Sequence, residues 1–186
     1  FVSFDNGLGL GVLNPSSLIK KTNFSVCLGQ IFGDTNDWDI PKSLQPDGSF
    51  SIFRSNKNFV ELLTDSVASR TIWYIKTEKM FIASSSQRAI VMLLGDFQTK
   101  IRTFSWMLSS VSLGPYNSWD KRIVYLPGNS RAILDRSKWQ LTITQKDVVF
   151  TSADLPYEEY KYRLRSVCEE TINKLQLDWS KWVLSL

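Results

Sequence analysis

A chain of 186 residues, 43% of them hydrophobic, can bury the core of one domain, or of one domain and the start of another. Its 22 basic and 18 acidic residues leave a net charge of +4, without the clustered cations of a nucleic-acid-binding face. The chain contains no histidine and no apolar run long enough to cross a bilayer, so we expect no metal site, no nucleic-acid partner and no membrane partner.

The first half of the chain predicts strands at residues 1–4, 8–13, 24–32, 50–54, 59–64, 71–76 and 80–83. The turn at Asp5, Asn6 and Gly7 is a strong hairpin signal, because Asn-Gly tolerates positive φ. Gly7, Gly9 and Gly11 resemble a phosphate-binding loop only superficially, since no Lys-Ser/Thr pair and no helix follows them. A loop rich in Asp, Asn, Pro and Gly is expected over 33–47.

The periodicity changes at Ser84, where helices begin to alternate with strands. Ser85 or Ser86 can cap a helix that Gly95 ends, and a second short helix is expected over 103–111. Strands are predicted at 123–126, 131–135, 139–144 and 148–150. A long helix follows from Pro156 to Leu175.

That long helix is predicted to be amphipathic. Its apolar positions, at helical spacing, are Tyr160, Leu164, Val167, Cys168 and Ile172. The charged residues expected to point away from this face are Glu158, Lys161, Arg165 and Glu169. Two antiparallel sheets with helices outside would accommodate the whole order of elements.

The apolar segment Trp182–Leu186 predicts the start of a buried strand after this helix. A chain that stops on such a strand stops inside a fold, so we expect a segment of a longer protein. The helix and the strand together are expected to open a separate α/β unit.

Two cysteines, Cys27 and Cys168, lie far apart and form no C-x-x-C pair. They predict buried, reduced thiols and a cytoplasmic location, in a chain without a signal-peptide pattern. The two densest basic segments, Lys20-Lys21 and 161–165, are short and are expected to be solvated surface.

Several motifs resemble those of the asparagine synthetase family in their order and spacing. They are 47–53 (DGSFSIF), 62–65 (LLTD), 69–74 (SRTIWY), 81–90 (FIASSSQRAI) and 119–129 (WDKRIVYLPGN). The resemblance runs from about residue 24 to the end of the chain. It implies an α+β fold with an N-terminal Ntn-hydrolase-like domain, a four-layer α-β-β-α sandwich of two antiparallel sheets, over residues 1–152. It also implies that 153–186 are the first helix and strand of a truncated α/β ATP-pyrophosphatase domain.

The residues that glutaminase chemistry requires in this family are missing. The family's nucleophile is a first-position cysteine, where this chain has Phe1. Its N-G-E-I-Y-N strand is matched by residues 28–33, in which the oxyanion donor has become Leu28 and the carboxylate has become Gln30. The usual insertion after this strand is absent or reduced to 35–46. The resemblance is therefore to the glutaminase-inactive branch, the β-lactam synthetases and lasso-peptide cyclases.

The resemblance implies an ATP-dependent enzyme that adenylates a carboxylate for attack by an amine of the same substrate. This segment would be structural, with no catalytic, cofactor or metal residue of its own. ATP and Mg would bind the C-terminal domain of the same protein, which would be its partner together with a peptide or small-molecule carboxylate substrate.

Two other functions remain open. One is a glutamine-dependent asparagine synthetase whose N-terminal Cys is missing from the chain, against which Leu28 and Gln30 argue. The other is a stand-alone binding module that is not catalytic.

Single residues also have alternative readings. Cys27 as a nucleophile is less favoured than a buried thiol. Asp65 and Arg70 could form a site, but a buried pair or turn anchors are favoured. Ser84–Ser86 could bind a ligand, although helix capping explains them.

Overall fold

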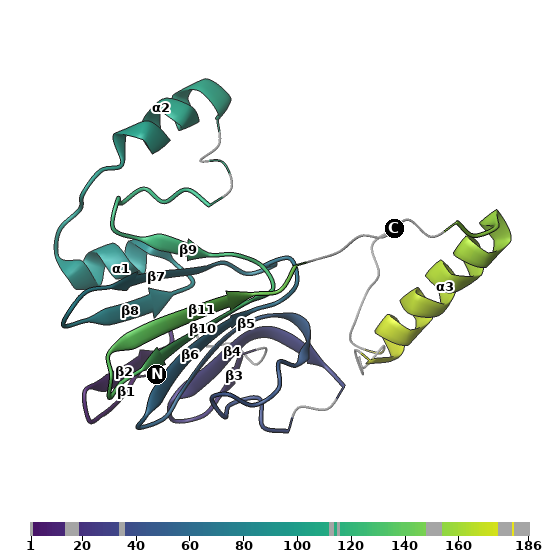
Figure 1. The fold of residues 1–186 in the computed structure, drawn as a ribbon, viewed down its shortest axis with the longest axis horizontal. Coiled ribbons are helices and arrows are strands. Elements are labelled where there is room, and N and C mark those ends of the chain that lie inside the picture. The colour runs from purple at the N-terminus through teal and green to yellow at the C-terminus, as the bar shows by residue number, and fades with distance from the viewer. Residues whose placement is uncertain are drawn as a thin grey trace.

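Three antiparallel sheets and three helices make up the part of the chain that the structure, a computed structural model, describes (Figure 1). The described residues are 2–13, 19–33, 36–111, 114, 116–147, 154–174 and 180. The expected α+β class is confirmed. Phe1, Leu175 and the predicted strands at 148–150 and 182–186 lie outside the described residues.

The strands are β1 (Val2–Asp5), β2 (Leu8–Gly11), β3 (Ile19–Lys21), β4 (Ser25–Phe32), β5 (Asp47–Ser55), β6 (Phe59–Thr64), β7 (Ile72–Lys76), β8 (Phe81–Ser84), β9 (Val124–Leu126), β10 (Ser130–Asp135) and β11 (Gln140–Gln145). The helices are α1 (Gln87–Leu94), α2 (Ile101–Ser110) and α3 (Tyr157–Lys174). Most of the predicted elements are therefore present with small shifts at their ends, whereas β3 was not predicted.

The strands form one large sheet and two smaller ones, where two sheets were expected. The six-stranded sheet has the order β11-β10-β6-β5-β4-β3, and the three-stranded sheet has the order β8-β7-β9. The opening hairpin, β1-β2, is a separate two-stranded sheet. Its turn residues Asn6 and Gly7 both have positive φ, 47° and 74°, which confirms the predicted hairpin turn.

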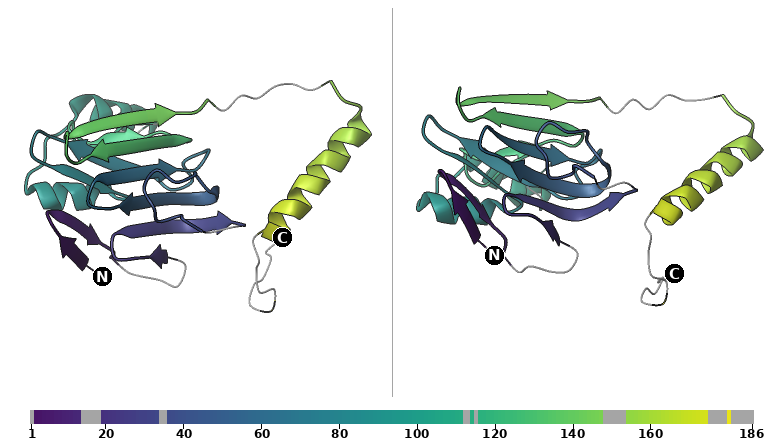
Figure 2. Two further views of the ribbon diagram at one scale, coloured as in Figure 1. Left: turned by 60° about the horizontal axis from the view of Figure 1, so that its bottom comes forward. Right: turned by 90° about the horizontal axis from the view of Figure 1, so that it is seen from below.

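The core consists of three layers of buried side chains on the two larger sheets. Figure 2 shows the ribbons of these sheets from two further sides. Leu62, Tyr74 and Leu126 belong to the layer between the six-stranded and three-stranded sheets. A second layer joins the three-stranded sheet to α1, where Ile90 is fully buried against Trp73. The third layer lies on the opposite face of the six-stranded sheet, because side chains alternate between the two faces of each strand.

That third layer is covered by a loop. Trp38, from the loop 36–46, packs on the cluster formed by Cys27, Ile31, Phe50, Ile52 and Leu63. Among the described residues, no helix packs on this outer face of the six-stranded sheet. The described layers are thus helix, sheet, sheet and loop, where the resemblance implies a fourth layer of helices.

Helix α1 begins and ends where the sequence predicts. Ser86 is its N-cap and Gly95, with φ of 74°, is its C-cap and donates its N–H to the carbonyl of Val91. The hydroxyl of Ser86 makes no capping hydrogen bond, however. Instead the backbone N–H of Ser86 donates to the hydroxyl of Ser84, at 3.1 Å. The serines thus shape the turn into α1, although the capping contact that we expected is absent.

Helix α3 stands apart from the sheets, at the opposite end of the molecule from α1 and α2 (Figures 1 and 2). None of its described residues is buried, and Leu164 and Val167, on its predicted apolar face, are exposed. The expected face exists in the sequence but is not covered by another described element. None of the described helices is long and apolar enough to cross a membrane.

Candidate functional site

Cys27 is the thiol nearest to the segment that the resemblance associates with catalysis. It lies in β4 on the outer face of the six-stranded sheet and is fully buried. Burial raises the pKa of this thiol to about 11, and the nearby cations Lys20 and Arg70 only partly oppose that shift. The thiol is therefore protonated at neutral pH and out of reach of a substrate, as expected for a structural cysteine.

Cys168 does not fit the same expectation. We predicted two buried thiols, but the Cys168 side chain, in α3, is exposed. Cys168 is exposed because no other described element covers the apolar face of α3. The chain therefore contains one shielded thiol and one accessible thiol.

The middle of β4 is shaped by a glycine. Gly29 has φ of 113°, in the region that side chains rarely adopt, and a Cβ there would collide with the carbonyl oxygen of Ser49. The same Cβ would lie 3.0 Å from Nε of Arg70, so the arginine side chain crosses the strand at this position. Its neighbour Leu28 has no polar side chain, and its neighbour Gln30 has a neutral amide in place of a carboxylate.

Asp65 is a turn anchor. This buried carboxylate accepts hydrogen bonds from the backbone N–H groups of Phe50, Val67 and Ser69, at 2.8, 2.9 and 3.1 Å. It also accepts one from the hydroxyl of Ser69. Arg70 takes no part in these contacts, so the structure favours the predicted anchor over a catalytic Asp65–Arg70 pair.

A short series of hydroxyls leads from this carboxylate to the surface. The hydroxyl of Ser69 donates to Asp65 and lies 2.8 Å from the hydroxyl of Ser49. Because Asp65 also accepts three backbone N–H groups of the same turn, this series of hydroxyls belongs to the turn anchor.

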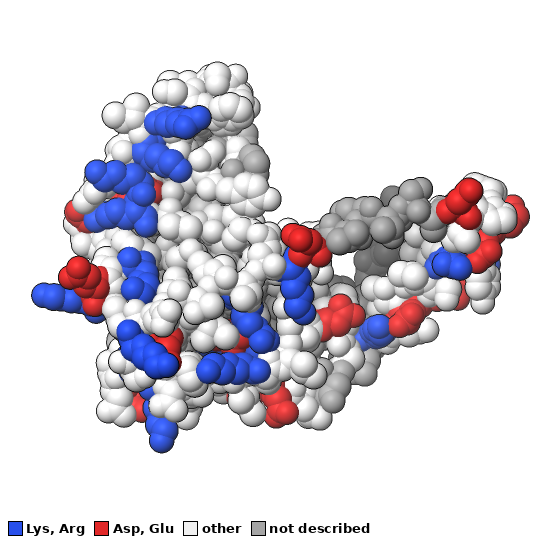
Figure 3. Space-filling model, viewed as in Figure 1, with Lys and Arg blue, Asp and Glu red and all other residues white. Residues whose placement is uncertain are grey.

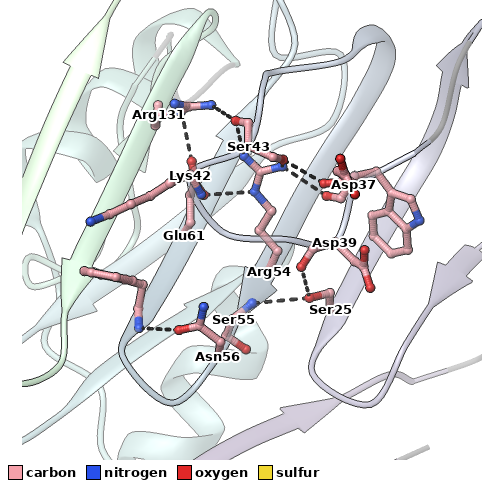
Figure 4. A network of polar contacts seen from close by, with 12 residues as sticks. Ser25, Asp37, Asp39, Lys42, Ser43, Arg54, Ser55, Asn56, Glu61 and Arg131 are labelled. Atoms are coloured by element: carbon pink, nitrogen blue, oxygen red, sulfur yellow. Dashed lines mark hydrogen bonds and ion pairs between the residues drawn. The ribbon is translucent and has the colours of Figure 1, made fainter.

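A buried ion network, which the sequence analysis did not predict, lies under the loop 36–46 (Figure 4). Arg54 in β5 and Glu61 in β6 are both fully buried, and Nε of Arg54 lies 2.9 Å from Oε2 of Glu61. Arg131 in β10 approaches from the other side, with its Nε 2.9 Å from Oε1 of the same carboxylate. One buried carboxylate thus holds two guanidinium groups from neighbouring strands.

The network fastens the loop to the sheet. Glu61 accepts the backbone N–H of Lys42 at 2.6 Å, and Arg54 donates to the carbonyl of Trp38 at 3.1 Å. Arg54 also donates to the hydroxyl and the carbonyl of Ser43, at 2.7 and 2.9 Å, and Arg131 donates to that same carbonyl at 2.6 Å. These contacts join three strands of the sheet to the loop backbone, which is the arrangement of a structural lock.

The pairing register of β5 and β6 could have revealed the Arg54–Glu61 pair from the sequence. The hairpin turn at 56–58 sets Arg54 directly opposite Glu61, and opposite charges across a strand pair favour each other. The burial of both side chains could not be read from the pattern, because it depends on a loop that crosses the outer face.

A second ionic cluster joins the segment after α1 to the segment before β9. Arg122 donates twice to the buried carboxylate of Asp120, from Nε at 2.9 Å and from its terminal nitrogen at 2.7 Å. It also pairs with Asp96, at 2.7 Å. The hydrogen bonds from Arg122 hold the pKa of Asp120 down, at about 2. This cluster is also structural, since all its strong donors and acceptors are engaged within the chain.

No group of three or more acidic or cysteine side chains is placed to hold a metal ion among the described residues. No family model matches the chain, and no curated protein matches it.

Proposed function

We propose that the chain is the glutaminase-inactive, Ntn-like part of an ATP-dependent amide-forming enzyme resembling asparagine synthetase. Two antiparallel sheets packed face to face, with α1 on the outside of one of them, are the arrangement that such a sandwich requires. The segment FIASSSQRAI, quoted for the resemblance, spans the turn from β8 into α1.

The main support for a domain without glutaminase activity comes from the residues of β4. Cys27 is buried and its thiol is protonated at neutral pH, while Leu28 and Gln30 replace the donor and the carboxylate of the active family members. The loop 36–46, fixed by Arg54 and Glu61, covers the outer face of the sheet beside this strand. A glutamine substrate would find neither the family's nucleophile nor the family's oxyanion donor at these positions.

The role left for such a domain is structural. It would pack against the ATP-binding domain of the same protein and help to shape the site for a carboxylate substrate. The uncovered apolar face of α3, with Leu164 and Val167 exposed, is consistent with a helix that belongs to that second domain. The carboxylate would be activated by adenylation and then attacked by an amine of the same molecule.

Two assays on the intact protein test the proposal. We expect no ammonia from glutamine above the rate of a Cys27→Ala control, and we expect AMP and pyrophosphate from ATP in the presence of a carboxylate substrate. Ammonia release at a rate typical of glutaminases would contradict the inactive assignment. ATP cleavage to ADP and phosphate, without AMP, would contradict the adenylating chemistry.

A further inference from the structure

Helices α1 and α2 and the segment between them expose many large apolar side chains. The exposed members are Met92, Leu93, Phe97, Ile101, Trp106, Leu108 and Val111. Single exposed hydrophobic residues are common, but seven within twenty consecutive residues indicate a surface that is covered by something else. We call these residues the α1–α2 face.

The residues around this face carry an excess of positive charge. Between residues 86 and 123 the chain has five cations and two acids, a net +3 of the +4 carried by the whole chain. Both acids, Asp96 and Asp120, pair with Arg122. Arg88, Arg102 and Lys121 have no acidic partner among the residues that the structure describes. Figure 3 shows blue side chains with little red over this end of the molecule.

We propose that the α1–α2 face binds an acidic, amphipathic segment of another protein. Its carboxylates would pair with Arg88, Arg102 and Lys121, and its apolar side chains would cover Leu93, Ile101 and their neighbours. Charge complementarity would select the partner and speed its association, while burial of the apolar groups would hold it. This inference stands apart from the proposed function, because it uses none of the residues around β4.

A second copy of the chain fits this face poorly. Two such faces would bring like charges together. The exposed apolar surface of α3 offers no free carboxylates in return. Its four acids each pair with a cation of the same helix, namely Glu158 with Lys161, Glu159 with Arg163, Glu169 with Arg165 and Glu170 with Lys174.

A membrane surface also fits poorly, because of how α2 is oriented. Its buried side is marked by Thr103, so Ile101, Ser105 and Leu108 lie on the side that points away from the protein. Serine hydroxyls, of Ser105 and the neighbouring Ser109, thus share this side with the two apolar side chains. A helix that binds a bilayer presents one continuous apolar face, whereas this mixed surface suits a partner that offers both apolar and polar groups.

The test measures binding of a labelled, designed amphipathic peptide of leucine and glutamate by fluorescence anisotropy. We expect the acidic peptide to bind with an affinity that falls as salt rises, and the same peptide with lysine in place of glutamate not to bind. The triple variant Arg88→Gln, Arg102→Gln, Lys121→Gln should lose about ten-fold in affinity, since each exposed pair contributes less than about 1 kcal/mol.

A matched triple variant, Lys57→Gln, Lys79→Gln, Lys138→Gln, removes three exposed cations elsewhere and should bind like the unaltered chain. Equal loss in both triple variants, or binding of the lysine peptide, would overturn the proposal. So would tight binding to vesicles containing phosphatidylglycerol without binding of the acidic peptide. A dimer in sedimentation experiments that the first triple variant abolishes would identify a second copy as the occupant instead.

Discussion

Asp120 is the carboxylate for which the structure gives the clearest dependence on pH. Its pKa is about 2 in the folded chain, below the 3.8 of an unperturbed aspartate, because Arg122 donates two hydrogen bonds to it. A depressed folded pKa stabilises the protein above the unfolded value, and that stabilisation is lost as the pH falls from about 4 towards 2. We therefore expect Asp120→Asn to lower the free energy of unfolding by about 2 kcal/mol at neutral pH.

Urea denaturation between pH 7 and pH 2 measures this effect. In the Asp120→Asn variant the stability should fall less steeply below pH 4 than in the unaltered chain. Asp96→Asn is the matched control, since Asp96 pairs with the same arginine but its side chain is 55% exposed. If Asp120→Asn and the unaltered chain lose stability in parallel below pH 4, the assignment of this pH dependence to Asp120 is wrong.

The two thiols should differ in reactivity. Cys168 is exposed, whereas Cys27 is fully buried and its pKa is raised to about 11. With a chromogenic disulfide reagent at pH 8, we expect one thiol to react rapidly in the folded chain and the second only after denaturation. Cys168→Ser should abolish the rapid phase, and Cys27→Ala should leave it unchanged. A rapid phase that survives in Cys168→Ser would show that Cys27 is accessible.

The junction between β5, β6 and the loop 36–46 depends on one carboxylate. Glu61→Gln would leave the fully buried Arg54 without its ionic partner, and breaking one side of a buried pair costs about 3–5 kcal/mol. We expect a loss of that size in the free energy of unfolding, measured with urea. The amide of Lys42, which donates to Glu61, should also exchange with solvent faster.

Glu78→Gln is the control for this prediction, because Glu78 is an exposed residue of the β7–β8 turn. It should change the free energy of unfolding by less than about 0.5 kcal/mol. An equal effect of the two substitutions, or an unchanged exchange rate at Lys42, would show that the network does not hold the loop.

The hairpins could be predicted from the sequence because their signals are local. The turns at Asn6-Gly7 and at Ser55-Asn56-Lys57 depend only on neighbouring residues, and the hairpins around both are found where expected. Helix α1 follows the same rule, since its apolar spacing and Gly95 are local signals. Strand β3 carries no such signal, because three residues, Ile19–Lys21, are too few to show a period.

The candidate site was only partly predictable for the same reason. The burial of Cys27 and the anchoring role of Asp65 agree with the readings that we favoured, since both residues lie in or at the end of strongly apolar strands. The lock between Arg54, Glu61 and the loop depends on contacts between segments far apart in sequence. No local pattern shows that the loop 36–46 crosses the outer face of the sheet.

Over the whole molecule, buried apolar residues are concentrated in the stacked sheets. The three hydrophobic clusters lie within the sheets, α1, the loop 36–46 and Ile123 just before β9, and none includes a residue of α3. The described contacts of α3 with the body include the ion pair of Lys174 with Asp47, at 3.9 Å between two partly exposed groups. Such a pair contributes little to stability.

The double variant Leu164→Asn, Val167→Asn should therefore leave the free energy of unfolding of this chain within about 0.5 kcal/mol, because both side chains are already in water. Leu134→Ala is the matched control in the core, where the side chain is 1% exposed, and it should cost about 2–5 kcal/mol. Urea denaturation followed by tryptophan fluorescence measures both. A loss above about 1 kcal/mol in the double variant would mean that α3 packs on the sheets in solution. If α3 belongs to a second domain, as the proposed function requires, the same double variant should destabilise a chain that contains that domain.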